Sequence, residues 1–389
     1  DKTPTQSKSS QSKSSQSKLP QAKLPQAKLA QLRASQKTDI NSRPLGVYAS
    51  KAMDKHLKKM VRHEAAVLKD TNIEELHQMR IGLRRLRTTI QTFETVLELP
   101  EPIQDTALKP LAKCLGRVRD LDVLLETLRD RHRPHLPSKE QKILDRILVK
   151  LQKKRDRNFK RMVQFLKGSD YKAIKQTFRV WIKNPQSNPT ANLKIGLSLP
   201  DLLLPVLSQT LLHPGWLATP DRSLETVQSK ATKSKEMKSK ATKSKGAKSP
   251  TKDSTVSASE IGQNEISLDV LNNWLDHDGI VLHDLRKQMK QLRYQADFFA
   301  PHYDATYAKT IQDFKTIQDL LGTLQDYWVL GQIFAKVQGK TWQESLPSLT
   351  AQIHRDRWTI WQQWEPLRQR YLTEDTRTEL RQMMLSPTR

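Results

Sequence analysis

One pattern of residues occurs twice in this chain of 389 residues, and its repetition restricts the fold more than any other feature. Residues 76–94, LHQMRIGLRRLRTTIQTFE, have a counterpart 206 residues later at 282–300, LHDLRKQMKQLRYQADFFA. A second pair, LGRVRDLDV at 115–123 and LGTLQDYWV at 321–329, has the same offset. Two patterns that keep both their spacing and their offset indicate an internal duplication.

Both longer stretches are predicted to be amphipathic α-helices. At about 100° per residue, one histidine and three cationic side chains of each copy fall within about 80° of one another, and large apolar side chains occupy the other side. The four are His77, Arg80, Arg84 and Arg87 in the first copy and His283, Arg286, Lys290 and Arg293 in the second. In both copies the histidine precedes the glycine of the second pattern by 39 residues, which leaves room for a return helix that packs against the first.

The rest of the chain is also helical in pattern. It contains only 12 Gly, and its 20 Pro lie mostly between periodic segments, which favours helices with well-defined ends. The single cysteine, Cys114, excludes an internal disulfide and indicates either a reducing compartment or no redox demand at all, so the cytoplasm is the default expectation. No segment approaches the roughly 20 apolar residues that a transmembrane helix needs, and we therefore expect no membrane span.

The formal net charge of +26 is unevenly distributed along the chain. Residues 1–38 carry +7 and residues 229–252 carry +8, and both segments are low in complexity. We interpret residues 1–40 as a disordered Lys/Gln-rich tail and residues from about 221 to 262 as a disordered Lys-rich insertion. Neither has enough apolar groups to offset the entropy of ordering. The part that is expected to fold remains basic.

The helical part divides into two repeats and a connection. We place the first repeat at residues 44–183 and the second at residues 266–385. The connection, residues 184–265, includes a leucine-rich helix at about 199–216, followed by the Lys-rich insertion.

Two further predicted helices carry cationic stripes. The stripe of the helix within residues 44–70 consists of Lys51, Lys55, Lys58 and Arg62, which fall within about 60° of arc. Such a stripe is usually a solvated face, but this one lies only a short turn from the first histidine helix, and stripes on antiparallel neighbours can face one cleft. On the helix at residues 138–166, Lys153 and Arg157 belong to a third stripe, and we include them among the candidate anion contacts.

The sequence shows no recognised catalytic pattern. A zinc-protease HExxH pattern that begins at His63 fails, because Val67 stands where the second histidine would be. The His-Asp pair at His283 lacks the further ligands of a metal phosphohydrolase. Asp120 and Asp122 are better explained by ion pairs with arginines than by metal ligation. We therefore expect no cofactor and no metal, and an enzyme that transfers phosphoryl groups is a minor alternative.

A helix face of His, Arg and Lys is suited to phosphate. Arginine contacts phosphate oxygens bidentately and lysine adds a mobile point charge. From His77 to Arg87 the face extends about 15 Å along the helix axis, which is longer than a single phosphate requires. Two such helices would form a continuous basic groove for a polyanion. For each histidine, a purely structural role in capping or packing stays open.

The pairing of HxxRxxxRRxR with a downstream LGxxRDxDV, and its degenerate repeat HxxRxxxKxxRY with LGxxQD, resembles the CHAD domain, the conserved histidine α-helical domain. The resemblance extends from about residue 45 to the C-terminal helices. It implies an all-α fold of two pseudo-symmetric four-helix bundles, a basic central surface, and binding of inorganic polyphosphate without catalysis. An ExExK strand, the mark of a fused triphosphate tunnel enzyme, does not occur, so we expect a stand-alone domain.

The resemblance also implies which residues bind polyphosphate. The family's basic positions are matched by His77, Arg80, Arg84, Arg87, His283, Arg286, Lys290 and Arg293. Less specific matches are Lys51, Lys55, Lys58, Arg62 and Arg119. The second copy departs from the pattern at Gln325, the counterpart of Arg119, so we expect no anion contact from that position.

Two functions follow as hypotheses. The first is non-catalytic binding of inorganic polyphosphate along the basic groove, in the cytoplasm and at polyphosphate granules. The alternative is nonspecific nucleic-acid binding through the Lys-rich tails and basic helices. Deletion of residues 1–40 and 229–252 would abolish binding only in the second case. The sequence identifies no partner protein.

Overall fold

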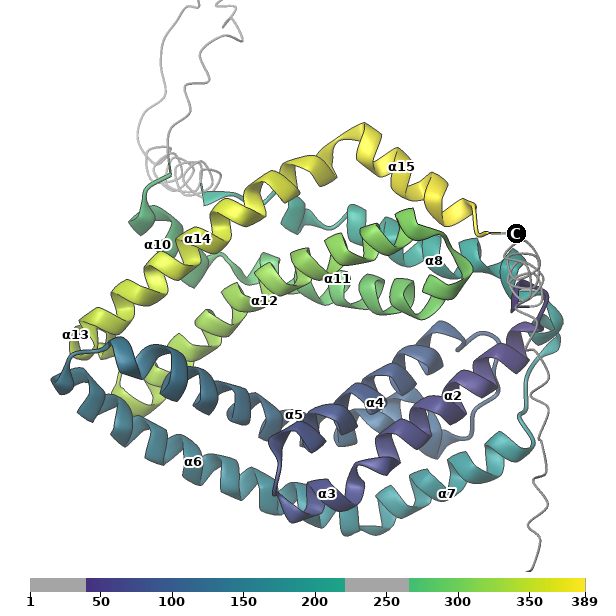
Figure 1. The fold of residues 1–389 in the computed structure, drawn as a ribbon, viewed down its shortest axis with the longest axis horizontal. Helices are drawn as coiled ribbons and strands as arrows, with labels where there is room; N and C mark the ends of the chain where they lie inside the picture. The colour runs from purple at the N-terminus through teal and green to yellow at the C-terminus, as the bar shows by residue number, and fades with distance from the viewer. Residues whose placement is uncertain (1–39, 221–265, 389) are drawn as a thin grey trace, which may run out of the picture.

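The computed structural model describes residues 40–220 and 266–388, and within these ranges the chain is all-α (Figure 1). Apart from helices, the described residues contribute two isolated β-bridges. The predicted all-α class is therefore confirmed, whereas the internal duplication stays a prediction. The N-terminal tail and the Lys-rich insertion fall outside the described residues. None of the described helices combines the length and the apolar character that crossing a bilayer requires.

The first half of the fold runs from α2 to α7. Its helices are α2 (Leu45–Arg62), α3 (Glu64–Lys69), α4 (Ile73–Thr92), α5 (Asp105–Glu126), α6 (Ser138–Lys167) and α7 (Ser169–Lys183). A π-helical turn, Thr127–His132, extends α5. The helix α4 begins at Asn72, whose side chain accepts a hydrogen bond from the Glu74 amide. Gly82 allows α2 to approach α4 closely, because a Cβ at this position would lie 2.6 Å from the backbone nitrogen of Met60.

The second half begins with the helix from the connection. Its helices are α8 (Ile195–Leu211), α10 (Leu268–His277), α11 (Ile280–Phe299), α12 (Ala305–Gln338), α13 (Trp342–Ser345), α14 (Pro347–Leu372) and α15 (Glu374–Leu385). The helix α8 begins and ends a few residues earlier than the sequence indicates, and a 3-10 turn follows it. It packs against α11 and α15, so this part of the connection completes the core of the second half.

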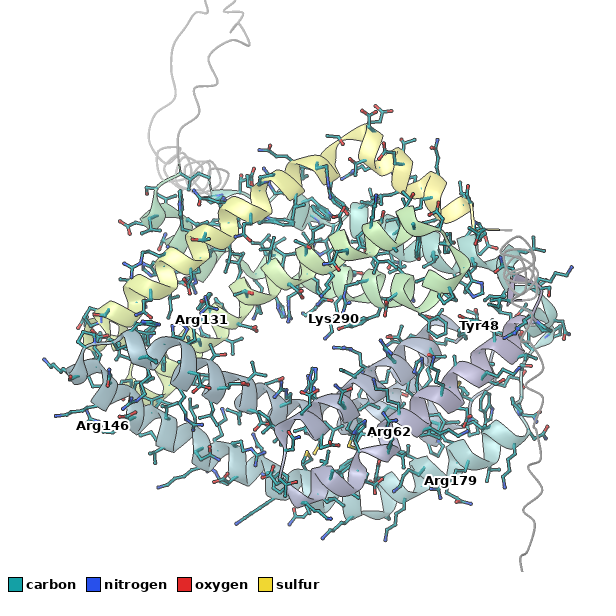
Figure 2. The ribbon with its side chains drawn as sticks, viewed as in Figure 1. Tyr48, Arg62, Arg131, Arg146, Arg179 and Lys290 are labelled. Carbon is teal, nitrogen blue, oxygen red and sulfur yellow. The ribbon has the colours of Figure 1, made fainter. Side chains whose placement is uncertain are left out.

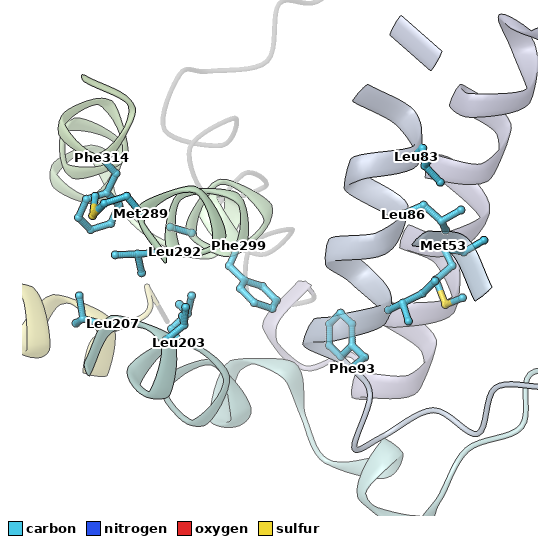
Figure 3. Close-up of a cluster of buried hydrophobic side chains, with 14 of the residues drawn as sticks. Met53, Leu83, Leu86, Phe93, Leu203, Leu207, Met289, Leu292, Phe299 and Phe314 are labelled. Carbon is cyan, nitrogen blue, oxygen red and sulfur yellow. The ribbon is translucent and has the colours of Figure 1, made fainter. Parts of the chain in front are cut away.

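The two halves meet at one end through aromatic side chains, which we call the aromatic junction: Tyr48, Phe93, Phe298, Phe299 and His302. Phe93, which directly follows α4, contacts both Phe298 and Phe299 of α11, with ring centroids 5.9 and 6.1 Å apart. Figure 3 shows Phe299 directed from α11 toward Phe93. The rings of Tyr48 and His302 complete the cluster. These contacts join the cores of both halves into one apolar cluster, so the junction fixes α4 relative to α11.

At the other end, a separate apolar cluster holds the halves together, and we call it the distal junction. It combines Leu125 of α5 and Ile147 of α6 with Leu330 of α12 and Ile353 of α14. Buried Glu140 strengthens it, because its carboxylate accepts hydrogen bonds of 3.0 and 3.2 Å from the first amides of α14. The two halves are thus joined at both ends (Figure 1).

Candidate anion-binding site

A central cavity of about 1210 Å³ lies between the two halves, lined by residues of α4, α5, α6, α11 and α12 and of the π-helical turn. Figure 2 shows Lys290 directed from α11 toward the space between the halves, and Arg131 near one end. A cavity for a drug-sized ligand is typically about 300–1,000 Å³. The size therefore favours an extended ligand.

The lining of the central cavity is strongly cationic. Among the described residues that line it, eleven are Arg or Lys and two are Asp. The cations are Arg80, Arg84, Arg87, Arg117, Arg119, Arg131, Lys154, Arg161, Arg286, Lys287 and Lys290, and the acids are Asp120 and Asp326. Such an excess of one sign raises the local concentration of anions.

The packing of Arg80 explains the spacing between the first histidine helix, residues 76–94, and the downstream pattern at residues 115–123. Its guanidinium lies against Gly116 of α5, where a Cβ would come within 2.6 Å of Nη1. One turn further along α5, Asp120 lies 3.5 Å from Nη2 of the same arginine. The glycine provides the space and the aspartate the orienting charge, so Arg80 is held in the cavity wall.

Arg286 occupies the corresponding environment in the second half. Its guanidinium lies against Gly322 of α12, where a Cβ would be 3.3 Å from Nε. Asp326, one turn further along α12, is also close enough to interact with Arg286. The surrounding protein partly desolvates the Asp326 carboxyl and raises its pKa, and nearby Asp120 adds to the rise. The glycines of both downstream patterns therefore receive the arginine of the preceding helix, and an aspartate lies near each of these arginines.

Arg84 of α4 and Lys290 of α11 lie close enough to interact where the two histidine helices face one another. The guanidinium groups of Arg84 and Arg293 both lie over the Tyr294 ring, 4.2 and 4.4 Å from its centroid. Burial lowers the pKa of Arg84, and Arg293 and Arg80 add to this effect. Burial, together with Arg84 and Arg286, lowers the pKa of Lys290 to about 8. The cations of the two halves thus repel one another across the cavity.

Both predicted histidines line the central cavity. Burial lowers the pKa of His77, and neighbouring Arg119 lowers it further. Burial also lowers the pKa of His283, with contributions from Lys287 and Arg286. In the free protein at pH 7 both rings are therefore mainly neutral, and an anion that stabilised the protonated rings would raise these pKa values.

Several nitrogen atoms of the cavity wall are buried without a hydrogen-bond acceptor in the part of the chain that the structure describes. They are Arg80 Nη1, Arg84 Nε, Arg119 Nε and Nη1, His283 Nδ1 and Arg286 Nε. A buried unsatisfied donor costs about 1–3 kcal/mol, and more when it is charged. Arg80, Arg84 and Arg286 are among the cations that repel one another, so the wall combines unpaired donors with an excess of positive charge.

Arg87 and Arg119 differ in how firmly they are held. Arg87 makes a bidentate ion pair with Asp105, with distances of 2.7 Å from Nε and 3.1 Å from Nη2. This pair compensates part of its charge. Arg119 has no ion pair among the described residues. Its counterpart Gln325 also lines the cavity, beside His283, and adds no charge.

Seven predicted residues do not line the central cavity: Lys51, Lys55, Lys58, Arg62, Lys153, Arg157 and Arg293. The four on α2 are excluded because this helix buries Met53, Leu57 and Met60 against α4, which turns the cationic stripe to the outside. Figure 2 shows Arg62 on this outer helix. Arg293 instead contacts Tyr294 and donates a hydrogen bond to Gln318. Lys153 and Arg157 line a second, smaller cavity.

Five cations of the central cavity were missed by the sequence analysis: Arg117, Arg131, Lys154, Arg161 and Lys287. Lys154 and Arg161 are seven residues apart, so they share one face of α6, adjacent to its buried stripe rather than opposite to it. This position beside the apolar stripe is the signal that could have identified them.

Asp120 and Asp122 form ion pairs with arginines. Asp122 accepts a hydrogen bond of 2.8 Å from Arg155, a buried arginine that also pairs with Asp70. Asp120 lies near Arg80, as described above. Residues 40–220 and 266–388 contain no group of three or more His, Cys, Asp or Glu side chains arranged to hold a metal ion.

The fold and its cavity define an all-α protein built around a cationic center, and comparison with known proteins identifies the family. The chain belongs to the CHAD domain family, whose model matches residues 51–335. The predicted family is thereby confirmed. No curated protein sequence matches the chain.

Two solved structures are similar in fold. PptA from Streptomyces chartreusis is 14% identical, with a TM-score of 0.52, over 84% of this chain and 99% of that chain. The CHAD domain from the plant Ricinus communis is 20% identical, with a TM-score of 0.49, over 89% of this chain and 93% of that chain. At 14% identity the likeness to PptA concerns the fold alone.

Proposed function

We propose that this protein binds inorganic polyphosphate in the central cavity. The observation that carries the proposal is the set of cations facing one another there, several of them with buried donors that lack an acceptor. Phosphate oxygens would satisfy these donors and would neutralise the repelling charges. Membership of the CHAD domain family, which is associated with polyphosphate binding, supports the same ligand.

A polymeric ligand fits the cavity better than a single phosphate. Cations of four helices and of the π-helical turn line it, and along α4 alone they are distributed from Arg80 to Arg87, about 10 Å apart along the axis. One phosphate could contact only a few of them. A linear chain with a negative charge on each phosphate would neutralise many at once, which favours its binding at physiological salt.

The proposed activity is binding without catalysis, in the cytoplasm at polyphosphate granules. The cavity wall offers arginine, lysine and histidine, which hold phosphate, and its two aspartates lie near arginines. Release of orthophosphate from polyphosphate by the purified protein with a divalent metal ion would contradict this part of the proposal. Colocalisation of the tagged protein with stained polyphosphate granules would test the location.

A charge-reversal experiment tests the cavity directly. In the full-length protein, Arg80, Arg84, Arg286 and Lys290 are replaced together by glutamate. The matched control carries the same four-residue reversal at Lys51, Lys55, Lys58 and Arg62, outside the cavity. Calorimetric titration with long-chain polyphosphate should show a loss of about a hundred-fold or more in the cavity variant and a much smaller loss in the control. Equal losses would mean that the net charge, and not the cavity, determines binding.

Nonspecific nucleic-acid binding is the competing function, because the Lys-rich segments resemble basic arms that bind phosphate backbones. These segments lie outside the described residues, so the test separates them from the helical body. A variant lacking residues 1–40 and 229–252 is titrated with polyphosphate and with duplex DNA at two salt concentrations. Polyphosphate binding that survives the deletion and the higher salt would support the cavity, and equal loss of both ligands would favour the alternative.

A further inference from the structure

A second, smaller cavity of about 310 Å³ lies between α6 and α12, and we call it the α6–α12 groove. Its lining contains five cations and three aliphatic side chains. The cations are Lys150, Lys153, Lys154, Arg157 and Lys336, and the lining contains no acidic residue. Every charged side chain that lines the groove is therefore positive.

The rotation of α6 about its axis directs these cations into the groove. Buried Arg155 donates a 2.8 Å hydrogen bond to Asp122 of α5 and pairs with Asp70 at the end of α3. These contacts anchor this turn of α6 to its neighbours in the first half. Leu151, one turn earlier, is buried in the distal junction. The side chains at positions 153 and 157 must then face away from that core, whereas Lys154 lies beside it and borders both spaces. Buried contacts of α6 therefore fix the orientation of the cations that line the groove.

The groove cations are not neutralised by carboxylates. Within residues 40–220 and 266–388, none of the five forms an ion pair. Lys150 donates to the carbonyl oxygen of Val337 across the groove, at 3.2 Å, and Arg157 donates to that of Lys153, at 3.3 Å. The nearest acid along α6, Asp156, accepts a hydrogen bond from Gln152. The positive charges thus remain available to an anion.

The groove adjoins the central cavity. Lys154 of α6 and Ile333 of α12 belong to the linings of both. Along α6, Arg161 and Lys154 line the central cavity, and Lys153, Lys154 and Arg157 line the groove. A small anion would occupy one of the two spaces, whereas a linear polyanion is able to contact both.

We propose that the α6–α12 groove is a second subsite that holds the part of a linear polyphosphate chain emerging from the central cavity. This proposal rests on the proposed function. Lysine and arginine supply the contacts to the phosphate oxygens, and the absence of carboxylates from the lining avoids repulsion. The groove lining has no aromatic side chain, so bases of single-stranded nucleic acid would find no stacking surface there. The subsite therefore selects for chain length.

The test compares a short and a long ligand on full-length protein. The groove variant combines Lys153→Glu, Arg157→Glu and Lys336→Glu, and leaves Lys154 intact because it also lines the central cavity. The matched control combines Lys139→Glu, Lys142→Glu and Arg146→Glu, three exposed cations at the start of α6 that line neither space. Circular dichroism and melting temperature establish that each variant folds. A milder variant with glutamine at the three groove positions guards against misfolding.

The groove variant should bind tripolyphosphate as the unaltered protein does, and should lose about ten-fold or more in affinity for a chain of about a hundred phosphates. The control should retain both affinities. Equal loss for both ligands, no loss for the long chain, or an equal loss for single-stranded DNA would each overturn the proposal.

The central-cavity variant separates this result from a failure of the proposed function. If the central-cavity variant loses affinity for both polyphosphates while the groove variant keeps both affinities, only the subsite is refuted. If the unaltered protein binds neither polyphosphate, the proposed function itself is refuted, and the subsite falls with it.

Discussion

Replacement of Lys290 by methionine should stabilise the free protein and weaken its binding of polyphosphate. Burial, with Arg84 and Arg286 nearby, lowers the pKa of Lys290 from 10.5 to about 8. Since one pKa unit corresponds to about 1.4 kcal/mol, the charged ammonium destabilises the folded protein at pH 7 by up to about 3 kcal/mol. Methionine retains an apolar chain of similar length and removes the charge.

The direction of the pH dependence provides an internal check. The folded pKa of Lys290 lies below the unfolded value, so the destabilisation is complete below about pH 8 and disappears as the pH rises toward 10.5. The stability advantage of the Lys290→Met variant should therefore be largest at neutral pH. It should shrink progressively in alkaline solution, because the lysine of the unaltered protein then loses its charge.

Urea denaturation in chloride buffers without phosphate measures this effect. At pH 7 the free energy of unfolding of Lys290→Met should exceed that of the unaltered protein by about 1–3 kcal/mol. The control, Lys315→Met, alters an exposed lysine of α12 outside the central cavity. It should change the free energy of unfolding little. A less stable Lys290→Met variant at pH 7, or an advantage that persists undiminished near pH 10.5, would refute the idea that this lysine is held against electrostatic repulsion.

Three further changes probe the same cavity. Gly116→Ala should lower polyphosphate affinity about ten-fold in calorimetry, because the new methyl group displaces Arg80. The melting temperature should fall little, because alanine favours the helix. Unchanged affinity would contradict this packing of Arg80 against Gly116. Affinity should rise as the pH falls below 6.5, because the bound anion favours protonated His77 and His283, whose pKa values are lowered in the free protein. Replacement of both by glutamine should flatten the profile, and a persisting rise would assign it to other groups. Asp326→Asn should raise the affinity a few-fold by removing a negative charge from the wall, and a decrease would instead show that this carboxylate positions Arg286.

The sequence predicts the fold class and the center of the site because both depend on local patterns. The histidine and arginine positions follow from helical periodicity. The 39-residue spacing to the glycine reflects a physical contact, since Gly116 receives Arg80 and Gly322 receives Arg286. A sequence pattern that includes both a side chain and the residue against which it packs can be recognised without a structure.

The remainder depends on how each helix is rotated about its axis, and distant contacts determine this rotation. The ion pairs of Arg155 with Asp70 and Asp122 join residues far apart in the sequence. They help to place Lys154, and not Lys153, toward the central cavity. On α2 and α6, a cationic stripe opposite the apolar stripe was therefore the wrong guide to the cavity wall, whereas on α4 and α11 it was the right one. A single sequence does not reveal which long-range pairs form.

The aromatic and distal junctions determine when the electrostatically unfavourable step of the proposed anion binding occurs. Because the halves are joined at both ends, the like charges of α4 and α11 are brought together while the chain folds, before any ligand arrives. The apolar contacts of the junctions offset that repulsion. The site is consequently preorganised: binding requires little rearrangement of the protein, and most of the ordering cost falls on the flexible ligand.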